Sequence, residues 1–340
     1  MNNNYKDILK NLTETAPPDR NDHLLIIDAM NTFIRSFSLL KAMNPQGHHI
    51  GGLVGFMRSL GFLVRTIDPT RVLCVFDGKG GSMNRKNIDP NYKAQRAHTR
   101  ITNWGMFDSK QEEYESMSAQ LDRLKDYLDC LPLQSLTMDK LEADDVISLI
   151  AKEYSARGRK VTIVSSDKDF LQLIDENISV HAPIKKTTYT KDNINEALEV
   201  IPQNYNIVKA LLGDNSDNLA GIKGLGIKTI LSEFPGIADD PTYTLDKVYE
   251  VCSEKLNDKK IFPKIIHDWD KVETNYQLMN LHETVLSEGE INTILEVMKE
   301  DTPGLQTGAF LHLLDMDRIE GITKNTEGWL ENFRPLTTVK

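Results

Sequence analysis

Three short, continuously apolar runs constrain the fold of this chain more than any other feature. They are LLIIDA from residue 24, RVLCVFD from residue 71 and VTIVSS from residue 161. Runs of this length without polar alternation are typical of strands buried on both faces. Between the first two, residues 51–67 carry apolar side chains at helical spacing, which indicates a right-handed crossover between parallel strands. The sequence therefore predicts an α/β fold with a mostly parallel sheet flanked by helices.

Acidic residues follow these runs or begin helices in five separate places. The carboxyl ends of parallel strands meet at one edge of a sheet, so we expect these side chains to converge. Convergent carboxylates cannot all stay ionised unless cations lie between them. An oxygen-rich set suits Mg²⁺, with Mn²⁺ as a substitute. The candidate metal ligands are Asp28, Asp77, Glu142, Asp144, Asp145, Asp167, Asp169, Asp214 and Asp217.

Helix capping is the competing interpretation for some of these acids. Glu142, Asp144 and Asp145 begin a helix predicted over residues 141–156, and acids are favoured at helix N-termini in any case. Asp167 and Asp169 precede the short apolar segment FLQLI and could cap it. The recurrence of acids in all five places favours a metal site.

The pattern along the chain divides it into four parts. Residues 1–22 are polar and predict a flexible leader, and residues 23–200 alternate strands and helices, as expected of a catalytic domain. From about residue 201 only helices are predicted, including residues 202–212 and 227–234, so 201–290 form a helical subdomain. Residues 291–340 form a tail of unknown role, structural or docking.

The segment 79–118 differs from the rest of the catalytic domain. It is longer than an ordinary connection, and its cations are interleaved with Tyr92, Trp104 and Phe107. A solvated, mobile insertion is one interpretation, and a functional one is favoured because the segment begins directly after Asp77. Its cations are Lys79, Arg85, Lys86, Lys93, Arg96 and Arg100.

A second specific signal is the glycine-rich stretch GDNSDNLAGIKGLGIKTI. Gly221, Gly224 and Gly226 permit a tight connection, and the helix that follows presents unpaired backbone N–H groups. A backbone phosphate of DNA fits such a site without base readout. Lys223 and Lys228 flank the glycines, so this stretch is predicted to bind DNA.

Composition limits the other possibilities. The formal net charge is −10, and two divalent cations would bring it to −10 + 4 = −6, so overall acidity does not exclude a nucleic-acid substrate. The three cysteines lie far apart, which favours buried thiols over a zinc or redox site. No signal peptide or membrane span is evident, so we expect a soluble, cytoplasmic protein without membrane partners.

In combination, these motifs resemble those of the structure-specific 5′ nucleases. That family comprises flap endonucleases, the 5′ nuclease domains of bacterial DNA polymerases, and the 5′-to-3′ exonucleases and ribonucleases H of bacteriophages. The resemblance covers about residues 23–234 and rests on IIDAMN, VFDGKG, NYKAQR, EADD, SSDKD, and GDNSDN followed by GIKGLG. It implies a PIN-like (Rossmann-like) catalytic domain, a helical arch over about 79–118, and a helix-hairpin-helix motif at 213–234 in the helical subdomain.

The resemblance also implies roles for individual residues. Asp28, Asp77, Glu142 and Asp144 would hold a first Mg²⁺ ion, with Asp145 as an accessory acid. Asp167, Asp169 and Asp217 would hold a second ion, assisted by Asp214. Lys93, Arg96 and Arg35 would act at the scissile phosphate, and a K⁺ ion would bind the helix-hairpin-helix. DNA contacts would come from Arg85, Lys86, Gly221, Lys223, Gly224, Gly226 and Lys228.

The implied activity is Mg²⁺-dependent hydrolysis of phosphodiester bonds at 5′ ends, flaps or RNA primers during DNA replication. The implied partners are DNA with a 5′ flap, nick or single-stranded 5′ end and RNA–DNA hybrids, together with a single-stranded DNA-binding protein or sliding clamp. A monomer encoded by a phage and acting in the host cytoplasm is expected. The alternatives are a PIN-type endoribonuclease and a non-catalytic protein that binds DNA junctions.

Overall fold

The computed structural model describes residues 19, 21–95, 103, 105–283 and 286–338. Almost all of the predicted leader 1–22 therefore lies outside the described residues. So do Arg96, Arg100 and Trp104 of the basic segment. No helix in the described part of the chain combines the length and apolarity needed to cross a membrane.

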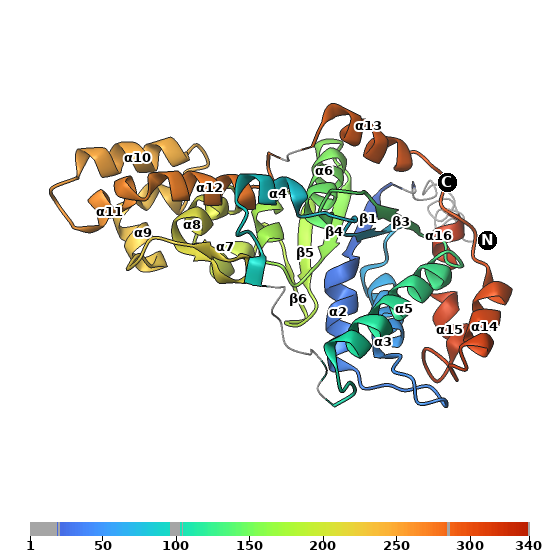
Figure 1. Cartoon of the computed structure of the whole chain (residues 1–340). Helices are drawn as coiled ribbons and strands as arrows, with labels where there is room; N and C mark the ends of the chain where they lie inside the picture. The colour runs from blue at the N-terminus through green and yellow to red at the C-terminus, as the bar shows by residue number, and fades with distance from the viewer. Residues whose placement is uncertain (1–18, 20, 96–102, 104, 284–285, 339–340) are drawn as a thin grey trace, which may run out of the picture.

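The described residues form one main sheet with the strand order β3-β2-β1-β4-β5-β6 (Figure 1). The first five strands are parallel, and β6 pairs antiparallel with β5. The predicted mostly parallel sheet flanked by helices is thus confirmed. The strands are β1 His23–Asp28, β2 Arg71–Phe76, β3 Gln134–Thr137, β4 Lys160–Val164, β5 Ile178–Ala182 and β6 Thr187–Tyr189.

The three apolar runs form the central strands β1, β2 and β4. Alternate residues of β1 enter two different cores: Leu24 and Ile26 face one, and Leu25 and Ile27 face the other. Strands β3 and β5 were not predicted, because QSLT and ISVHA mix polar and apolar residues near the edges of the sheet. Burial on both faces is therefore restricted to the strands that the apolar runs identify.

Helices cover both faces of the sheet. The core on one face contains residues of α2 Ala29–Leu39, α3 Gly51–Ile67 and α5 Lys110–Leu128. The core on the other face contains residues of α6 Ala143–Ala156. The short helix α4 Met83–Ile88 lies in the basic segment, and residues 107–118 of that segment return to the body: Phe107 stacks on Phe37 with ring centroids 5.6 Å apart.

The helical region extends from the β6 edge of the sheet (Figure 1). Its apolar residues join the core on the α6 face. The helix predicted over 202–212 begins as a 3₁₀ turn, Pro202–Asn204, before the α-helix starts. A small hairpin of β7 Gly213–Asp214 and β8 Leu219–Ala220 connects α8 to α9. The helices are α7 Ile194–Leu198, α8 Tyr205–Leu212, α9 Ile227–Glu233, α10 Leu245–Glu254, α11 Ile261–His267 and α12 Trp269–Met279.

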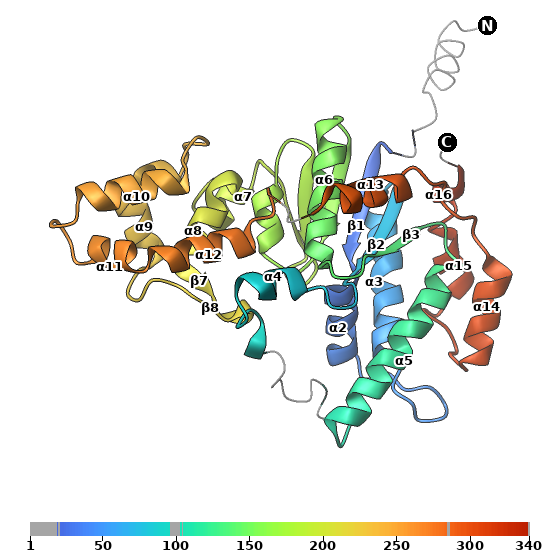
Figure 2. The ribbon, with the colours of Figure 1, turned by 45° about the horizontal axis from the view of Figure 1, so that its top comes forward.

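The C-terminal segment packs against the catalytic domain. Helix α13 Glu288–Val297 contacts α6, whereas α14 Thr307–Met316, α15 Thr326–Glu331 and α16 Pro335–Thr338 lie beside α3 and α5 (Figure 2). Phe310 lies 5.2 Å from Tyr127 of α5 and 5.4 Å from Trp329, measured between ring centroids. Both Phe310 and Trp329 belong to the core on the α3 face. The segment therefore completes that core.

Candidate active site

Four of the predicted acids line one hollow at the carboxyl ends of the strands. Asp28 ends β1, Asp77 follows β2, Asp144 lies in the first turn of α6, and Asp167 follows β4. Their hollow has a volume of about 340 Å³ and is also lined by the basic residues Lys93 and Arg35, and we call it the first acid hollow. The sheet topology thus brings together side chains that are far apart in the sequence.

Local hydrogen bonds hold two of these acids in place. Asp28 is the N-cap of α2: one carboxylate oxygen accepts from the backbone N–H of Asn31 at 3.1 Å, and the other accepts from the Ser165 hydroxyl at 2.8 Å. Asp77 accepts a 2.9 Å hydrogen bond from the backbone N–H of Ala143, which fixes the end of β2 against the start of α6. Capping and convergence therefore coexist in the same residues.

The charge in the first acid hollow is not fully balanced by the protein. Burial, together with repulsion from Asp77 and Asp167, raises the pKa of Asp28 to about 7. Burial and the neighbouring Asp167 also raise the pKa of Asp144 well above its ordinary value. Both shifts have the sign expected when carboxylates crowd together in a partly dehydrated space. A cation entering this hollow would relieve that repulsion.

Lys93 and Arg35 are the basic residues that line the first acid hollow. Lys93 Nζ donates to Glu142 at 2.8 Å, and the backbone N–H of Lys93, whose φ is 55°, donates to the carbonyl of Asp217 at 2.9 Å. Arg35 Nε is buried and has no hydrogen-bond partner among the residues that the structure describes. A buried donor of this kind costs free energy unless a ligand satisfies it, so Arg35 is placed to receive an anion.

Glu142 and Asp145 belong to a separate, buried ion-pair cluster. Arg85 donates to Glu142 at 2.7 Å and to both oxygens of Asp145 at 2.7 and 2.9 Å, and it also donates to the carbonyl of Leu278. Burial opposes ionisation of Glu142, yet Arg85 and Lys93 lower the pKa of its carboxyl below the ordinary value.

This cluster bears on two of the predicted roles, which stay predictions. Arg85 was predicted to contact DNA, but it is only 5% exposed and its guanidinium points into the protein. Asp145 was predicted to be an accessory metal ligand, but both of its oxygens are engaged by Arg85. The physical reason is that α4 folds back toward the start of α6, so the arginine neutralises acids that the sequence pattern alone assigns to an ion.

A second hollow, about 520 Å³ in volume, lies on the other side of Asp167. It is lined by Asp214 and by Lys209 of α8, and we call it the second acid hollow. Lys209 Nζ forms ion pairs with Asp169 and, at 2.8 Å, with Asp214. Lys209 hydrogen-bonds Asp214, as do the backbone and hydroxyl of Ser216, and against the effect of burial these contacts lower the pKa of Asp214 to about 2.

Asp169 differs from Asp214 although both contact the same ammonium group. Burial outweighs the attraction of Lys209 and, with repulsion from Asp167, raises the pKa of Asp169 to about 7. Asp217 is buried and accepts a 3.3 Å hydrogen bond from the Tyr92 hydroxyl, which also donates to Glu142 at 3.2 Å. Tyr92 thus connects Glu142 at the start of α6 to Asp217 in the connection between α8 and α9.

The glycine-rich connection between α8 and α9 lies next to these acids in the sequence. A Cβ on Gly221 would lie 1.9 Å from the carbonyl oxygen of Leu212, and Gly224 has a φ of +87°, so both positions require glycine. Gly226 is the N-cap of α9. Lys223 and Lys228 are exposed beside it, and Lys86 is exposed on α4. Arg96 lies outside the described residues.

Sequence reasoning missed Lys209, Tyr92 and Ser165 as parts of the site. Lys209 is a lone lysine in the apolar helix YNIVKALL, five residues before Asp214, and that isolation was the available signal. Tyr92 was noted only as an aromatic residue in a basic segment. The Ser165 hydroxyl connects Asp28 to the backbone N–H of Asp167 at 3.0 Å.

Five of the predicted acids line the two hollows, and the other four lie outside the described lining of either: Glu142, Asp145, Asp169 and Asp217. Among the described residues, no group of three or more His, Cys, Asp or Glu side chains is arranged to hold a metal ion as it stands. Lys93, Arg85 and Lys209 instead supply the positive charge between several of the carboxylates. Binding an ion would therefore require carboxylate side chains to turn toward it.

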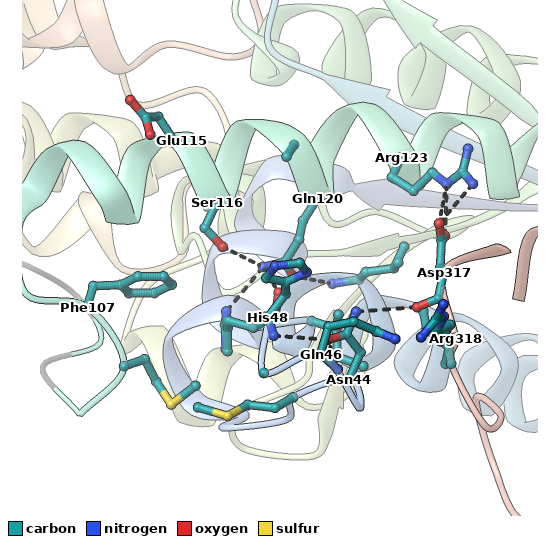
Figure 3. A pocket seen from close by; sticks show the side chains of 18 of the residues that line it. Asn44, Gln46, His48, Phe107, Glu115, Ser116, Gln120, Arg123, Asp317 and Arg318 are labelled. Atoms are coloured by element: carbon teal, nitrogen blue, oxygen red, sulfur yellow. Dashed lines mark hydrogen bonds and ion pairs between the residues drawn. The ribbon is translucent and has the colours of Figure 1, made fainter.

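A larger hollow lies away from the acids (Figure 3). It has a volume of about 720 Å³ and is lined by the 43–50 loop, by α5 and by residues 316–319. Arg123 holds Asp317 at its edge through hydrogen bonds of 2.8 to 3.1 Å. No predicted site residue is among the described residues that line it, so it is not the candidate active site.

Comparison with known proteins gives consistent results. Residues 23–199 match a family model described as the N-terminal resolvase-like domain of 5′-3′ exonucleases. A 5′-3′ exonuclease of Aquifex aeolicus is 32% identical over 210 residues, which cover 62% of this chain and 68% of that protein. A 5′-3′ exonuclease of Bacillus subtilis is 30% identical over 254 residues, which cover 72% and 76%.

The fold is also similar to that of the flap endonuclease of bacteriophage T5, whose structure was solved with DNA and metal ions. The TM-score is 0.59 at 18% sequence identity, and the match covers 87% of this chain and 99% of the T5 chain. At that identity the likeness concerns the fold.

Proposed function

Because the chain belongs to the 5′-3′ exonuclease family, we propose that it hydrolyses phosphodiester bonds at 5′ flaps, nicks and single-stranded 5′ ends of DNA, and removes RNA from RNA–DNA hybrids during replication. The chain is a nuclease. One observation supports the reaction most directly: Asp28, Asp77, Asp144 and Asp167 line a single hollow together with Lys93 and Arg35. Acidic side chains that could hold a cation and basic side chains that could contact a phosphate therefore face the same space.

The residues of the first acid hollow fit Mg²⁺ by their chemistry. All four acids offer oxygen ligands, which Mg²⁺ prefers, and Mn²⁺ accepts the same ligands. The raised pKa values of Asp28 and Asp144 indicate negative charge that the protein leaves unbalanced. We assign one ion to Asp28, Asp77 and Asp144, with Asp167 facing it across the hollow.

A second ion would use Asp167 and Asp214, which line the second acid hollow, together with Asp169 and Asp217. Asp169 and Asp214 are held by Lys209 and Asp217 by Tyr92, so an ion would compete with these contacts. We therefore propose that the second ion binds more weakly than the first. Glu142 remains near the first ion but serves chiefly to hold Lys93.

When bound, two divalent ions would supply a hydroxide nucleophile at neutral pH and offset the charge on the leaving 3′ oxygen. The protein side chains would contact the phosphate and orient the acids. Lys93 and Arg35 would contact the non-bridging oxygens of the phosphate, where negative charge grows in the transition state. The hydrogen bonds from Ser165 and Asn31 would orient Asp28 and favour its ionised form against the effect of burial.

DNA contacts are proposed for three exposed lysines. Lys223 and Lys228 beside the glycine connection and Lys86 on α4 are exposed cations suited to backbone phosphates. The glycine connection would act as the helix-hairpin-helix motif, with a K⁺ ion on its carbonyl groups. Hydrogen bonds from Gln95 to Asn218 and from Asn218 to the Asn91 carbonyl already tie the turn that follows α4 to this connection.

The experiment that tests the proposal is product mapping. End-labelled nicked, 5′-flapped and RNA–DNA duplexes would be incubated with the protein in Mg²⁺, in Mn²⁺ and in chelator. We expect metal-dependent products that start from the 5′ end or lie at the flap junction, with Asp28→Asn inactive. Cleavage that persists in chelator, or that is confined to single-stranded RNA, would contradict the proposal.

A further inference from the structure

An apolar slot opens beside both acid hollows. The β5–β6 hairpin contributes Val180, Ala182 and Tyr189, and helices α7 and α8 contribute Leu198, Tyr205 and Val208. Its volume is about 380 Å³. Pockets that bind small molecules are usually apolar, contain a few polar groups, and enclose roughly 300 to 1,000 Å³. The slot has the size and lining of a site for one small group.

The slot shares walls with the proposed active site. Ser166 and Asp167 line the slot and both acid hollows. Ile184 lines the slot and the first acid hollow, whereas Tyr205 and Leu212 line the slot and the second. Any group in the slot therefore lies directly beside whatever occupies the space between the acids.

The chemistry of the walls suits a flat group that is apolar on its faces and polar at its edge. The half-buried ring of Tyr205 offers a stacking surface, and Ile184, 67% exposed, leaves an apolar edge open to solvent. Tyr189 is a buried part of the wall, with the ammonium group of Lys185 over its ring. Ser166 Oγ is buried without a hydrogen-bond partner among the described residues. Lys168 and Lys185 add positive charge to the lining.

We propose that the slot receives one unpaired nucleobase of the strand whose phosphodiester lies between the acids. This inference rests on the proposed function, because that function places a nucleic-acid strand at the shared wall. The strand is negatively charged at its phosphates and neutral at its bases, which matches lysines beside an apolar interior. The volume suits a single base, so the base must leave its pair before it enters.

The test combines a slot-filling variant with abasic substrates. Ala197 is exposed and lines the slot but neither acid hollow, so Ala197→Phe fills the slot without touching the proposed catalytic groups. Ala309→Phe on α14 is the matched control, because Ala309 is also an exposed helical alanine. Binding of a 5′-flap duplex is measured in Ca²⁺ while one abasic nucleotide is moved along the cleaved strand.

In the wild type, one abasic position is expected to weaken binding about tenfold, the scale of one stacked base. Ala197→Phe should weaken binding of the intact substrate to a similar extent and should then be insensitive to the abasic site at that position. Ala309→Phe should behave as the wild type. Ile184→Ala, a change at an exposed side chain, should show a smaller loss with the same insensitivity and serves as a second variant if Ala197→Phe does not fold.

The slot assignment would be overturned if the loss of binding caused by Ala197→Phe and the loss caused by the abasic nucleotide add up at every abasic position. If the wild type also cleaves the flap in Mg²⁺, that result overturns the slot alone and leaves the proposed function intact. A wild type that neither binds nor cleaves flapped DNA would overturn both. The two failures are therefore distinguishable.

Discussion

The ammonium group of Lys93 lies 2.8 Å from a carboxylate oxygen of Glu142, across 49 residues of sequence. Lys93 also lines the hollow that contains Asp28, Asp77, Asp144 and Asp167. The pair therefore holds a cation at the edge of the acids while the carboxylate of Glu142 stays ionised at the start of α6. This arrangement implies that Lys93 is positioned before any substrate arrives.

The first prediction concerns Lys93. Lys93→Met should lower kcat on a 5′-flap substrate by about a hundredfold, because a preformed positive charge near the reacting phosphate acts mainly in the transition state. The Kd for the same DNA in Ca²⁺ should change by less than about threefold. Lys324→Met, at an exposed lysine in the C-terminal segment, is the control and should change neither value. A loss confined to Kd would show that Lys93 is a binding residue.

The ion pairs of Lys209 with Asp169 and Asp214 lead to a second prediction. Its removal leaves Asp169 and Asp214 without their shared cation, and breaking a buried ion pair typically costs about 3 to 5 kcal/mol. Lys209→Met should therefore lower the Tm in chelator, and Mn²⁺ should restore more of the Tm than it adds to the wild type. The double variant Lys209→Met/Asp169→Asn should recover part of the loss in chelator. Equal Mn²⁺ responses in all three proteins would exclude competition between Lys209 and a metal ion.

The first acid hollow predicts a pH dependence of stability in the metal-free protein. The pKa of Asp28 is raised to about 7 in the folded state, whereas an unfolded aspartate titrates near 4. Between these values the folded protein binds more protons than the unfolded chain, so stability falls as pH rises. Asp169 contributes with the same sign. Asp214, with a pKa lowered to about 2, loses its stabilising contribution only below about pH 4.

We therefore expect the Tm in chelator to fall between pH 5 and pH 8, by roughly 2 °C for each kcal/mol lost. Asp28→Asn should flatten that slope and raise the Tm at pH 8, because it removes one of the repelling charges. Mg²⁺ at pH 8 should raise the Tm of the wild type more than that of the variant. An unchanged slope in Asp28→Asn would show that this carboxylate does not carry the effect.

The sequence predicted the central sheet and the places of the acids, because both depend on local patterns. LLIIDA, RVLCVFD and VTIVSS are buried on both faces, and their carboxyl ends must lie at one edge. It did not predict β3 and β5, whose mixed sequences are buried by partners that only the tertiary fold supplies. The positions of the acids could be predicted from the sequence, but the basic residues that pair with them could not.

Two counter-ions and one hydrogen-bond donor illustrate this limit. Arg85 and Lys209 approach the acids from α4 and α8, and their distances from the acids depend on how those helices pack. Tyr92 lies in a turn whose conformation is set by contacts with the 213–220 hairpin and α12. No periodicity or spacing in the sequence predicts these contacts. A helix within residues 290–299 was expected and matches α13, whereas α14, α15 and α16 were missed because each spans at most ten residues, too few for periodicity to identify a helix.

The last prediction tests whether the C-terminal segment stabilises the catalytic domain. A Cβ on Gly61 of α3 would lie 1.9 Å from Trp329 Nε1, so α15 depends on a glycine at this point of contact. Alanine usually stabilises a helix by about 1 kcal/mol over glycine, whereas overpacking a core costs about 1 to 3 kcal/mol. Because the clash is severe and the indole ring is buried, Gly61→Ala should lower the Tm.

The matched control is Gly308→Ala on α14, where a Cβ would meet nothing within 4 Å, and it should leave the Tm unchanged or raise it. Trp329→Leu removes the indole ring, so adding Gly61→Ala to that variant should no longer destabilise it. If Gly61→Ala lowers the Tm equally with and without Trp329, the contact between α3 and α15 is not the reason that position 61 requires glycine. Non-additivity would instead show that the segment after residue 291 is held to the catalytic domain at this contact.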